Sequence, residues 1–590
     1  MNPETKTCQN CKQPFRIEPD DFAFYEQIKV PPPTFCFDCR LERRMVWRNE
    51  RSLYRRKCNA PGHSEDIISM YAPEGEYNVV DSKFWWSDGW DPMMYGLYYN
   101  FSVPFFKQFE RLTHSVPLLN LSIVNSNNSD YTNYVDGNKD CYLVFGSGWN
   151  ENVNYGNKIM GNKDSQDLLG TTKCELSYES VNCVECYRLL YSRNCKACSN
   201  SWFLYNCRNC QDCVGCANQN NKTHCIFNVQ YSKEEYEKKL GELGLNTVGG
   251  IASVKEEFTK TYLQVPHRYA NIFNSVDCTG ENINDSKNVK YSFDIFEKME
   301  DSRYMYGSLQ TKDCYDGNGI YQNPMCYETV DANIGQNVHM SLTIYSSNDI
   351  TYCWNCHSSS DLFGCVGLRN KKYCILNKQY TKEEYDELLP KIKKHMNDMP
   401  YVDKIGRKYG YGEYFPDEIS PFAHNESISQ EYFTLSKEET EKAGYAWRNM
   451  LERDYRPTLR SDQLPDSSSF PESIANEVVE CEHKGSCNEQ CTTAFKFIPA
   501  EIQFYKRLNL PLPHFCPNCR HYARLRQRNP IKLWHRKCQC VGEASENGVY
   551  QNTVQHQHGA GKCPNEFETS YSPERKEIVY CEQCYQAEVV

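Results

Sequence analysis

The sequence predicts a mainly β protein in which a duplicated β-solenoid, rich in Cys, Asn and Tyr, lies between two copies of a cysteine-paired metal module. Three observations lead to this prediction. The same cysteine spacing occurs near both ends of the chain, residues recur every 12 positions in the middle, and the middle is itself duplicated at an offset of 149 residues. Short helices are predicted to cap the two solenoid halves.

The metal module is defined by two loop lengths that both recur. In the stretches 8–58 and 487–538, 24 residues separate the second and third cysteines, and 18 residues separate the fourth and fifth. A short loop between two cysteines places two thiolates on one metal, and a second such loop completes a tetrahedron, so these sets indicate structural zinc sites. The predicted ligands are Cys8, Cys11, Cys36 and Cys39 in the first module and Cys487, Cys491, Cys516 and Cys519 in the second, where Cys481 is an alternative.

After its first cysteine pair, the first module continues with characteristic aromatic, aliphatic, proline and arginine positions. These are Phe15, Ile17, Phe24, Tyr25, Pro33 and Arg40, the last of which follows Cys36-x2-Cys39. With them the module resembles the bacterial domain family described as a probable zinc ribbon. The arrangement of two modules around a Cys-rich middle is similar to uncharacterised bacterial proteins. The resemblance implies zinc and a small β-ribbon fold at each end, and it implies no enzymatic activity.

The similarity of the two ends extends beyond the first metal site, because residues 71–74 match residues 571–574. At the same offset of 500, the C-terminal copy provides a second set of four zinc ligands that ends in a C-x2-C pair. The predicted ligands are Cys538, Cys563, Cys581 and Cys584, and the alternative ligands are Cys540, His556 and His558.

The N-terminal copy of this second site is predicted to be lost or weak. It keeps Cys58 and His63, and Asp81 can ligate a metal, but Phe84 stands where the other copy has its last cysteine. A phenyl ring has no lone pair to offer zinc. We therefore expect about three zinc ions per chain, with packing of the aromatic run 84–86 in place of a fourth.

Length and composition limit the classes of protein to consider. A chain of 590 residues has room for about four domains. The first ten residues are polar and do not form a signal peptide, and no apolar run approaches the length of a membrane span. The 33 cysteines fall largely at metal spacings, which favours a reducing cytoplasm over a secreted, disulfide-bonded protein. The net charge of −11 excludes a chain that is basic throughout.

Both modules nevertheless carry a local basic segment, at 40–57 and 520–537, with Trp and Tyr among the basic residues. Such a segment can bind phosphates and stack on bases. It can equally be a solvated face, or one that docks on the acidic middle of its own chain. The candidate nucleic-acid-binding residues are Arg43, Arg44, Arg48, Arg51, Arg55, Arg520, Arg524, Arg526, Arg528 and Arg536.

The middle of the chain has the short fixed period of a solenoid. Cys314, Cys326, Val338, Ile350 and Leu362 follow one another at steps of 12. Because aliphatic residues replace cysteine at equivalent steps, cysteine here is interpreted as a small buried hydrophobic residue. We expect cysteine, aliphatic and aromatic side chains inside and Asn or Asp at the corners, in a coil of about 24 residues. Eight cysteines within 183–216 leave open a zinc or iron–sulfur site.

Each solenoid half is followed by a predicted helix. Ser232 with Glu235, and Thr381 with Glu384, have the spacing of a capping box. Such helices can cover strand edges at the ends of a solenoid. The predicted segments are a zinc module at 1–91, a helical connector at 92–120, the solenoid halves at 121–264 and 265–400, an extended linker at 401–480, and a double-zinc module at 481–590.

No sequence motif indicates catalysis, since phosphate-binding loops, HExxH, GxSxG and Rossmann glycines are all missing from the sequence. The leading prediction is a non-catalytic, zinc-binding scaffold that binds a protein partner. One alternative is nucleic-acid binding through the basic segments. The other is a solenoid hydrolase, for which the repeated acids Asp277, Asp301, Asp313 and Asp349 are the candidates.

Overall fold

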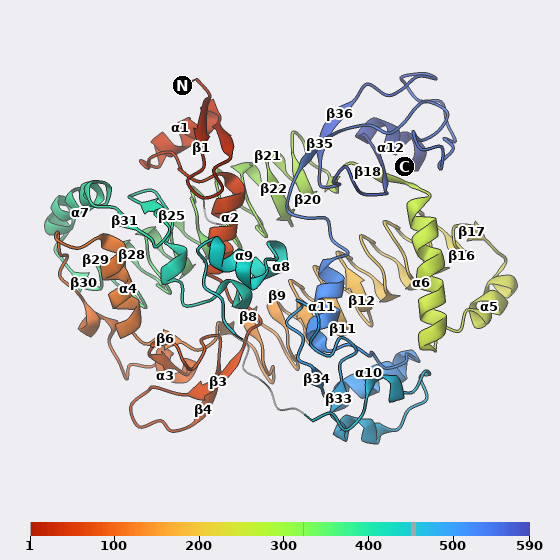
Figure 1. Ribbon diagram of the computed structural model, residues 1–590, viewed down its shortest axis with the longest axis horizontal. Coiled ribbons are helices and arrows are strands. Elements are labelled where there is room, and N and C mark those ends of the chain that lie inside the picture. Colours follow the sequence, from red (N-terminus) through yellow and green to blue (C-terminus); the bar gives the residue numbers. More distant parts are fainter. Residues whose placement is uncertain (1, 323, 450–455, 590) are drawn as a thin grey trace. The chain divides into compact units, whose positions relative to one another are not determined.

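The computed structural model describes residues 2–322, 324–449 and 456–589 (Figure 1). Strand residues outnumber helical residues. The chain divides into two compact units, each made of two stretches that are distant in the sequence. Unit 1 comprises Met1–Leu121 and Ala270–Asn449, and unit 2 comprises Ser122–Tyr269 and Met450–Val590. Each unit therefore combines one terminal module with one half of the repeated middle.

The repeats of unit 2, residues 122–230, are called the first repeat stack. Its strands are parallel and follow sequence order, and each residue pairs with the one 12 positions later, as Val135 does with Ser147. An antiparallel strand, β17, closes the sheet. The strands are β7 (Ile123–Val124), β8 (Asn133–Asp136), β9 (Phe145–Gly148), β10 (Glu151–Asn157), β11 (Lys163–Leu169), β12 (Tyr178–Val181), β13 (Tyr187–Leu190), β14 (Ser199–Trp202), β15 (Gln211–Val214), β16 (Thr223–Ile226) and β17 (Val229–Gln230).

The repeats of unit 1, residues 271–379, are called the second repeat stack. Its parallel strands pair mostly at the same step of 12, with steps of 11 and 13 near its start. Ile350, for example, pairs with Leu362. Cys314 and Cys326, one repeat apart, form a disulfide. The strands are β19 (Ile272–Phe273), β20 (Gly280–Asn284), β21 (Lys287–Lys290), β22 (Ser292–Ile295), β23 (Glu300–Arg303), β24 (Val330–Asn333), β25 (Gln336–His339), β26 (Leu342–Tyr345), β27 (Asn348–Thr351), β28 (Ser360–Phe363), β29 (Lys372–Ile375) and β30 (Lys378–Gln379).

Within each 12-residue repeat the backbone follows a period of three. From 173 to 215 every third residue has a positive φ, and from 174 to 216 the residue after each of these is buried. Four such triplets make one repeat, so the chain turns four times before a residue meets its neighbour in the next repeat. The expected coil of about 24 residues is wrong, because paired residues are 12 positions apart.

The short repeat also explains which side chains lie inside. The buried positions that follow each positive φ from 174 to 216 hold only Cys, Ser and Leu. The expectation of aromatic residues inside is wrong for this stretch. Tyr178, Tyr191 and Phe203 fall outside the buried register and pack against other elements of unit 2. A repeat of three-residue sides leaves too little room for a ring.

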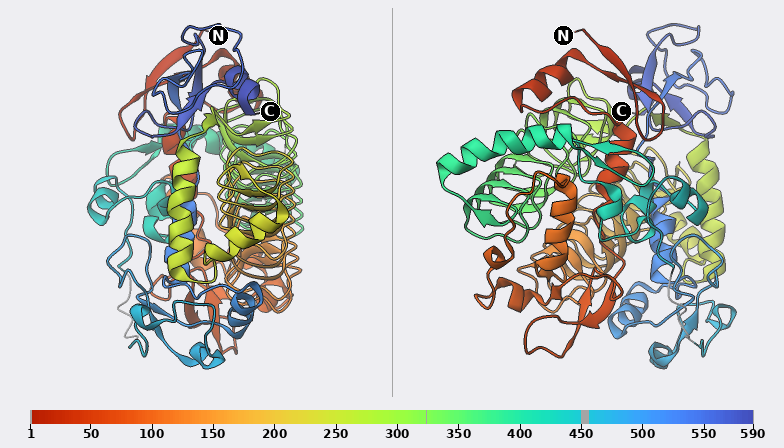
Figure 2. Two further views of the ribbon diagram at one scale, coloured as in Figure 1. Left: turned by 90° about the vertical axis from the view of Figure 1, so that its right-hand side faces the viewer. Right: turned by 60° about the vertical axis from the view of Figure 1, so that its left-hand side comes forward.

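Helices of unit 2 cover part of the first repeat stack. Helix α5 (Lys233–Glu242) begins at Ser232 with the predicted capping box, and the longer α6 (Val248–Leu263) runs alongside the strands (Figure 2, left). Phe258 and Tyr262 of α6 belong to one buried cluster with aromatic residues of the stack. The apolar outer face of the stack is thus buried by the segment that directly follows it in sequence.

In unit 1 the covering elements come from both sides of the stack in sequence. Helix α7 (Lys382–Asp398) begins at Thr381 with the second predicted capping box. The predicted connector contains α4 (Phe105–Ser115), whose Phe105 contacts the rings of Tyr352 and Phe363. The extended linker expected from residue 401 is wrong up to residue 449, because this segment is packed into unit 1 and buries Tyr414 and Phe415. Residues 450–455 lie outside the described residues.

The remaining elements belong mainly to the terminal modules. In unit 1 they are β1 (Glu4–Thr7), β2 (Pro14–Ile17), α1 (Pro19–Gln27), α2 (Phe37–Val46), β3 (Tyr54–Lys57), β4 (Asp66–Ser69), β5 (Val79–Val80), α3 (Ser82–Trp86), a 3-10 turn η1 (Pro92–Tyr95), β6 (Leu118–Leu119), β31 (Tyr401–Val402), β32 (Lys408–Tyr409), η2 (Asp417–Ile419), η3 (His424–Glu426), α8 (Ser429–Tyr432) and α9 (Lys437–Lys442). In unit 2 they are β18 (Pro266–Arg268), η4 (Ser461–Gln463), η5 (Glu472–Asn476), β33 (Val479–Glu480), β34 (Ala494–Phe495), α10 (Pro499–Leu508), α11 (Pro517–Leu525), β35 (Trp534–Lys537), β36 (Glu566–Thr569), β37 (Ile578–Tyr580) and α12 (Glu582–Val589). Among the described residues, no helix is both long and apolar enough to cross a membrane.

Candidate metal centres and the docking of the terminal modules

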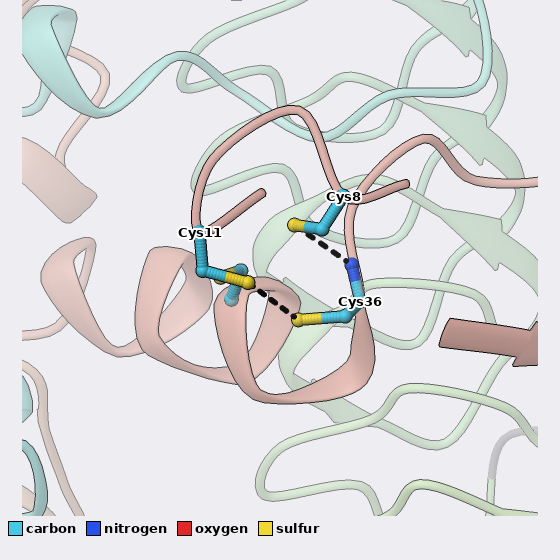
Figure 3. Close-up of side chains that lie close together, drawn as sticks. Cys8, Cys11 and Cys36 are labelled. Carbon is cyan, nitrogen blue, oxygen red and sulfur yellow. Dashed lines mark hydrogen bonds between the residues drawn. The ribbon is translucent and has the colours of Figure 1, made fainter. Parts of the chain in front are cut away.

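The first predicted metal site forms as expected in unit 1. Cys8 follows β1, Cys11 lies in the turn before β2, and the remaining two cysteines lie at the start of α2. The sulfurs of Cys8, Cys11 and Cys36 point toward one another (Figure 3), and those of Cys11 and Cys36 are 3.7 Å apart. The group that could hold a metal ion is Cys8, Cys11, Cys36 and Cys39.

The corresponding group in unit 2 differs from the prediction in one ligand. It contains Cys481, Cys491, Cys516 and Cys519, so the assignment of Cys487 to this tetrad is wrong and the alternative, Cys481, takes its place. Cys481 directly follows β33, as Cys8 follows β1, and its backbone N–H bonds to the carbonyl of Thr493. The loop to Cys491 is simply longer here, and Cys487 lies within that loop.

The third group is the second predicted site of unit 2, and all four of its ligands are confirmed as neighbours. Cys538 follows β35, Cys563 precedes β36, and Cys581 and Cys584 lie at the start of α12. Sulfur–sulfur distances in it are 3.7 Å for Cys563–Cys584 and 3.9 Å for Cys563–Cys581. Two sulfurs bound tetrahedrally to one zinc lie about 3.8 Å apart, given a bond of about 2.3 Å, so the spacing suits a metal of that size.

The three tetrads share one backbone hydrogen bond. In each, the N–H of the cysteine at the start of a helix donates to the sulfur of the first cysteine of the set. The N···S distances are 3.3 Å for Cys36 to Cys8, 3.3 Å for Cys516 to Cys481, and 3.2 Å for Cys581 to Cys538. A donor that faces a sulfur favours its thiolate, which is the form that binds a metal.

The equivalent position in unit 1 brings together Cys58, His63 and Asp81. The Nδ1 of His63 lies 3.6 Å from the Cys58 sulfur and 3.1 Å from a carboxylate oxygen of Asp81. Asp81 also caps α3 by accepting a bond from the N–H of Phe84, whose ring packs edge-on against His63. A ring therefore occupies the place that a sulfur occupies in unit 2, and the predicted loss or weakness of this site stays a prediction.

Two further groups each share one cysteine with a tetrad of unit 2. One consists of His483, Cys487, Glu489 and Cys519, so Cys487 is close to a metal-binding group although outside its tetrad. The other consists of Cys584 of the third tetrad with Cys540, His556 and His558, the three residues that the sequence offered only as substitute ligands. In both cases a donor set lies directly beside a complete tetrad.

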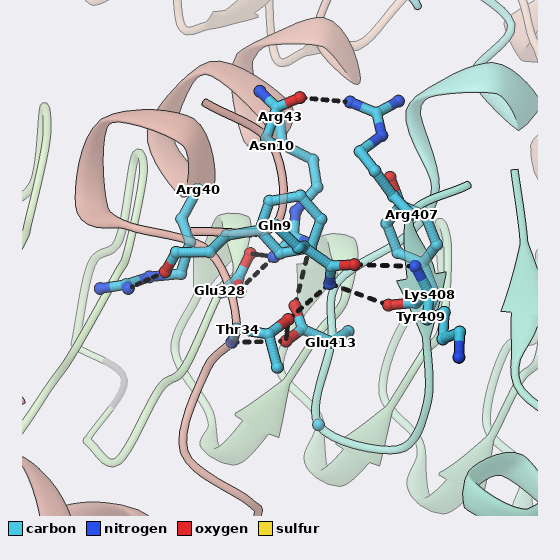
Figure 4. Close-up of polar contacts among 12 residues, drawn as sticks. Gln9, Asn10, Thr34, Arg40, Arg43, Glu328, Arg407, Lys408, Tyr409 and Glu413 are labelled. Carbon is cyan, nitrogen blue, oxygen red and sulfur yellow. Dashed lines mark hydrogen bonds and ion pairs between the residues drawn. The ribbon is translucent and has the colours of Figure 1, made fainter. Parts of the chain in front are cut away.

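The predicted basic segment of unit 1 does not form an exposed face. Arg40 and Arg44 on α2 are buried, and each is within 3.1 Å of a carboxylate oxygen of Asp316 in the second repeat stack. Arg43 lies between Glu328 and Glu413 and donates to both (Figure 4). These guanidinium groups are used to attach the module to the stack of its own unit, and they are not accessible to a nucleic acid.

Unit 2 has the same attachment. Arg520 and Arg524 on α11 are buried and pair with Asp167 of the first repeat stack, at 3.1 and 2.8 Å. Arg524 also pairs with Glu179, one repeat further on, at 2.9 Å. Adding 149 to Asp167 and Glu179 gives Asp316 and Glu328, and adding 480 to Arg44 gives Arg524. The two interfaces therefore share these positions, although Ala523 stands in α11 where α2 has Arg43.

Aromatic residues repeat the same correspondence. Tyr25 of α1 packs edge-on against Tyr327, with ring centroids 5.2 Å apart, and Tyr505 of α10 packs edge-on against Tyr178 at 5.6 Å. Both pairs are buried. Each module thus docks through one helix that packs an aromatic ring against the stack and another that inserts arginines, and the sequence offsets of 480 and 149 were the signal that could have revealed it.

Burial makes the charged groups of this interface costly. It raises the pKa of Glu179 and of Glu328 to about 7 each, although arginines beside them act in the opposite direction. Removing one partner of a buried ion pair strongly destabilises the folded protein, because the other charge is left buried without compensation. The paired charges therefore fix which surface of the stack each module occupies.

The other candidate basic residues are engaged within their units to differing degrees. Arg48 pairs with Glu50 and Asp331, and Arg51 with Glu431. Arg526 is exposed and pairs with Glu489, while Arg536 donates to backbone carbonyls. Arg528 is half-buried and has a partner. Arg55 is exposed.

The cysteines inside the first repeat stack have the environment of packed thiols. Cys195 is buried and its sulfur lies 3.3 Å from the carbonyl oxygen of Arg193. At the equivalent position of the second repeat stack, 149 residues on, stands Ile344, which is also buried. Leu204 and Cys353 show the reverse exchange. An apolar residue can occupy the same place, as the sequence indicated.

The candidate catalytic acids of the repeats share one backbone conformation, although Asp301 lies in β23 and Asp349 in β27. Asp277, Asp301, Asp313 and Asp349 all have a positive φ. Asp301 and Asp349 each accept a bond of 2.9 Å from an Asn side chain of the preceding repeat. Asn and Asp adopt this backbone region more readily than most residues. These contacts give the two carboxylates a structural role in joining neighbouring repeats.

Comparison with known proteins identifies no family for this chain. No family model matches it, and no curated protein matches it. One solved structure that it matches is that of a protein named as an acetyltransferase from Desulfovibrio desulfuricans G20, at 10% identity and a TM-score of 0.08, covering 46% of this chain and 67% of that one. At that TM-score the match carries no argument. The resemblance to the zinc-ribbon domain thus stays a prediction.

Proposed function

We propose that this chain is a non-catalytic scaffold that binds a protein partner, with zinc ribbons at both ends fixed onto 12-residue β-solenoids. The observation that carries the proposal is the duplicated docking interface. Arg44 and Arg524 place the basic side of each module against the acidic residues of a stack. The ribbons therefore have an intramolecular, structural role, in which each stabilises the long surface of the repeat stack in its own unit.

Zinc is the proposed metal because four thiolates at tetrahedral spacing suit it better than oxygen-preferring cations. Each tetrad is closed by protein ligands, so it offers no open position for an activated water. This supports a structural role for the metal. The exchange of Cys195 for Ile344 at equivalent positions favours thiols that pack without a metal in the interior.

The proposed partner surface is the segment 86–101 of unit 1. Met94 is 83% exposed and Tyr98 is 74% exposed, and Trp86 and Phe101 add further exposed apolar area within the same segment. Exposed apolar residues gathered in this way mark interaction sites. Asp88 and Asp91 are exposed nearby, so the expected partner is a protein with an apolar surface bordered by basic residues.

The test compares affinity capture by the wild-type chain with capture by a Met94→Ser/Tyr98→Ser variant. A matched control, Val549→Ser/Val554→Ser, alters exposed apolar residues of unit 2. We expect a protein bound by the wild type and the control, but not by the first variant, and the same difference when that protein is purified and titrated. If both variants bind it equally, this surface and the proposed function built on it are wrong.

A further inference from the structure

Beside the third tetrad lies a second donor set with its own supporting contacts. The Nδ1 of His556 is 3.3 Å from the Cys540 sulfur, and the Nε2 of His558 is 3.4 Å from the Cys584 sulfur. The four ligand atoms lie within 4.8 Å of one another. Thiolate and imidazole donors in a set of four are a typical combination for zinc.

The hydrogen bonds of the two histidines leave the correct nitrogens free for a metal. The Nε2–H of His556 donates to a carboxylate oxygen of Glu588 at 2.7 Å, in a pair that is almost entirely buried. The Nδ1–H of His558 donates to the carbonyl of Gly561 at 2.9 Å. In metal sites the ring nitrogen away from the ion is held in this way, which fixes the tautomer and the ring orientation.

The carboxylate and the remaining thiol are supported as well. Glu588 also accepts bonds from Thr553 and from the hydroxyl of Tyr550, so its position is fixed from several sides. The side-chain amide of Asn552 donates to the Cys540 sulfur at 3.2 Å, as backbone N–H groups do in the three tetrads. Such contacts are more than a chance cluster of donors requires.

We propose that the C-terminal module holds two zinc ions bridged by the thiolate of Cys584. Two tetrahedra that share one corner need seven donors, and seven are present. They are Cys538, Cys563 and Cys581 for the first ion, Cys540, His556 and His558 for the second, and Cys584 for both. A thiolate sulfur has several lone pairs and can bind two ions at once. The inference rests on the proposed zinc binding by the first of these sets.

The experiment replaces zinc with cadmium-113 in the full chain and records its NMR spectrum. Two signals that split one another by scalar coupling are expected, because the two ions share a sulfur. In a His556→Ala/His558→Ala variant, one of the two signals and the splitting should vanish, and zinc content should fall by one ion per chain. His535→Ala, which alters an exposed histidine of the same module, should change neither.

The outcomes separate this inference from the proposed function. An unsplit signal from the tetrad alone, or an unchanged zinc content in His556→Ala/His558→Ala, would overturn the second ion while leaving the tetrad in place. Absence of zinc from the tetrad itself would overturn both the second ion and the zinc binding that the proposed function assumes. If the variant unfolds locally and loses two ions, the presence or absence of splitting in the wild-type spectrum still decides the question.

Discussion

Units 1 and 2 each contain an equivalent interface between terminal module and repeat stack, but they differ in the cysteine groups that could hold a metal. Both insert two arginines beside one aspartate, Asp316 or Asp167, at positions related by the internal offsets of the sequence. Beyond the first tetrad, however, unit 2 has another complete tetrad, whereas unit 1 has Phe84 in place of the last cysteine. Attachment to the stack is thus present in both copies, while in unit 1 a phenyl ring lies where the second group of unit 2 has its last cysteine.

Of all the changes considered, removing metal should destabilise the terminal modules most, and it should destabilise the module of unit 2 more than that of unit 1. A structural zinc contributes about 10–16 kcal/mol to the folding of a small zinc-binding peptide. We expect a chelator to abolish hydrogen-exchange protection in α2 and α11 while the strands of the stacks remain protected, and more ions to leave unit 2 than unit 1. Restoring zinc is the control. Equal losses of metal from the two units would contradict the comparison.

Neutralising the aspartate that pairs with two arginines tests the interface between module and stack that each unit contains. Asp167→Asn and Asp316→Asn each remove the carboxylate that two buried guanidinium groups share, which should destabilise the attachment by up to about 3–5 kcal/mol. Hydrogen exchange should rise in α11 for the first variant and in α2 for the second. The control Asp349→Asn alters an exposed acid of the second stack but leaves an amide oxygen to accept the bond from Asn337, so it should stay within about 0.5 kcal/mol of wild type. Protection that survives in both helices would mean that these ion pairs do not hold the modules.

The difference between the units can be removed by restoring the missing ligands. Asp81→Cys/Phe84→Cys gives unit 1 the set Cys58, His63 and two new thiolates. We expect one additional zinc ion per chain, and a stabilisation of about 4 kcal/mol when free zinc is 1,000 times its dissociation constant. Metal analysis gives the count. Phe84→Ala is the matched control, and a wild type that already binds zinc at Cys58 would show that the site was never lost.

A smaller effect is expected from pH. His267 is buried and its pKa is lowered by that burial to about 3, so the folded state keeps the ring neutral. An unfolded histidine takes up a proton near pH 6.5, so this contribution to stability is present above pH 6.5 and is lost as the pH falls toward 3. At pH 5 the loss amounts to about 2 kcal/mol. Urea unfolding of wild type and His267→Gln at pH 7.5 and 5 should show a smaller pH effect in the variant.

The smallest effect is expected for a cysteine of the first stack whose equivalent in the second stack is aliphatic. Cys195→Ala should cost about 1 kcal/mol, a typical value for one substitution, and leave metal content unchanged. Ile344→Ala, at the equivalent position of unit 1, should cost about 2–5 kcal/mol, because a larger cavity is left. Loss of zinc or iron from the Cys195 variant would instead identify the cysteines of 183–216 as a metal site.

How much the sequence could predict depended on whether a feature repeats. The tetrads of Cys8 and Cys538, the 12-residue period and the capping boxes at Ser232 and Thr381 each rest on local spacing, and the structure contains them. Cys487 was chosen over Cys481 because it lies nearer to Cys491 in sequence, whereas the ligand is set by the end of β33. In a single sequence, a longer loop between the same two ligands cannot be distinguished from a change in which cysteine is the ligand.

Other features depend on contacts between distant segments. Burial of Arg44 and Arg524 follows from acids 272 and 357 residues away in the sequence. The basic segments by themselves left three alternatives open, and the structure supports the one in which they dock on the acidic middle of their own chain. The coil length was overestimated because aromatic residues were placed inside. Their place outside follows from the three-residue sides, which are visible in the sequence as Cys, Ser or Leu at every third position from 174 to 216.

The pairing of modules with stacks has a consequence for the order of events during synthesis. The N-terminal module can dock on its repeat stack only after Glu328 has been synthesised. The delay is roughly 270 residues, or roughly 15 to 55 seconds at 5–20 residues per second. The C-terminal module meets a platform that has long been complete. For most of that interval the ribosome presents a module with uncovered arginines and aromatic rings, such as Arg44 and Tyr25. Early metal binding would then decide whether this fragment stays folded until its platform is made.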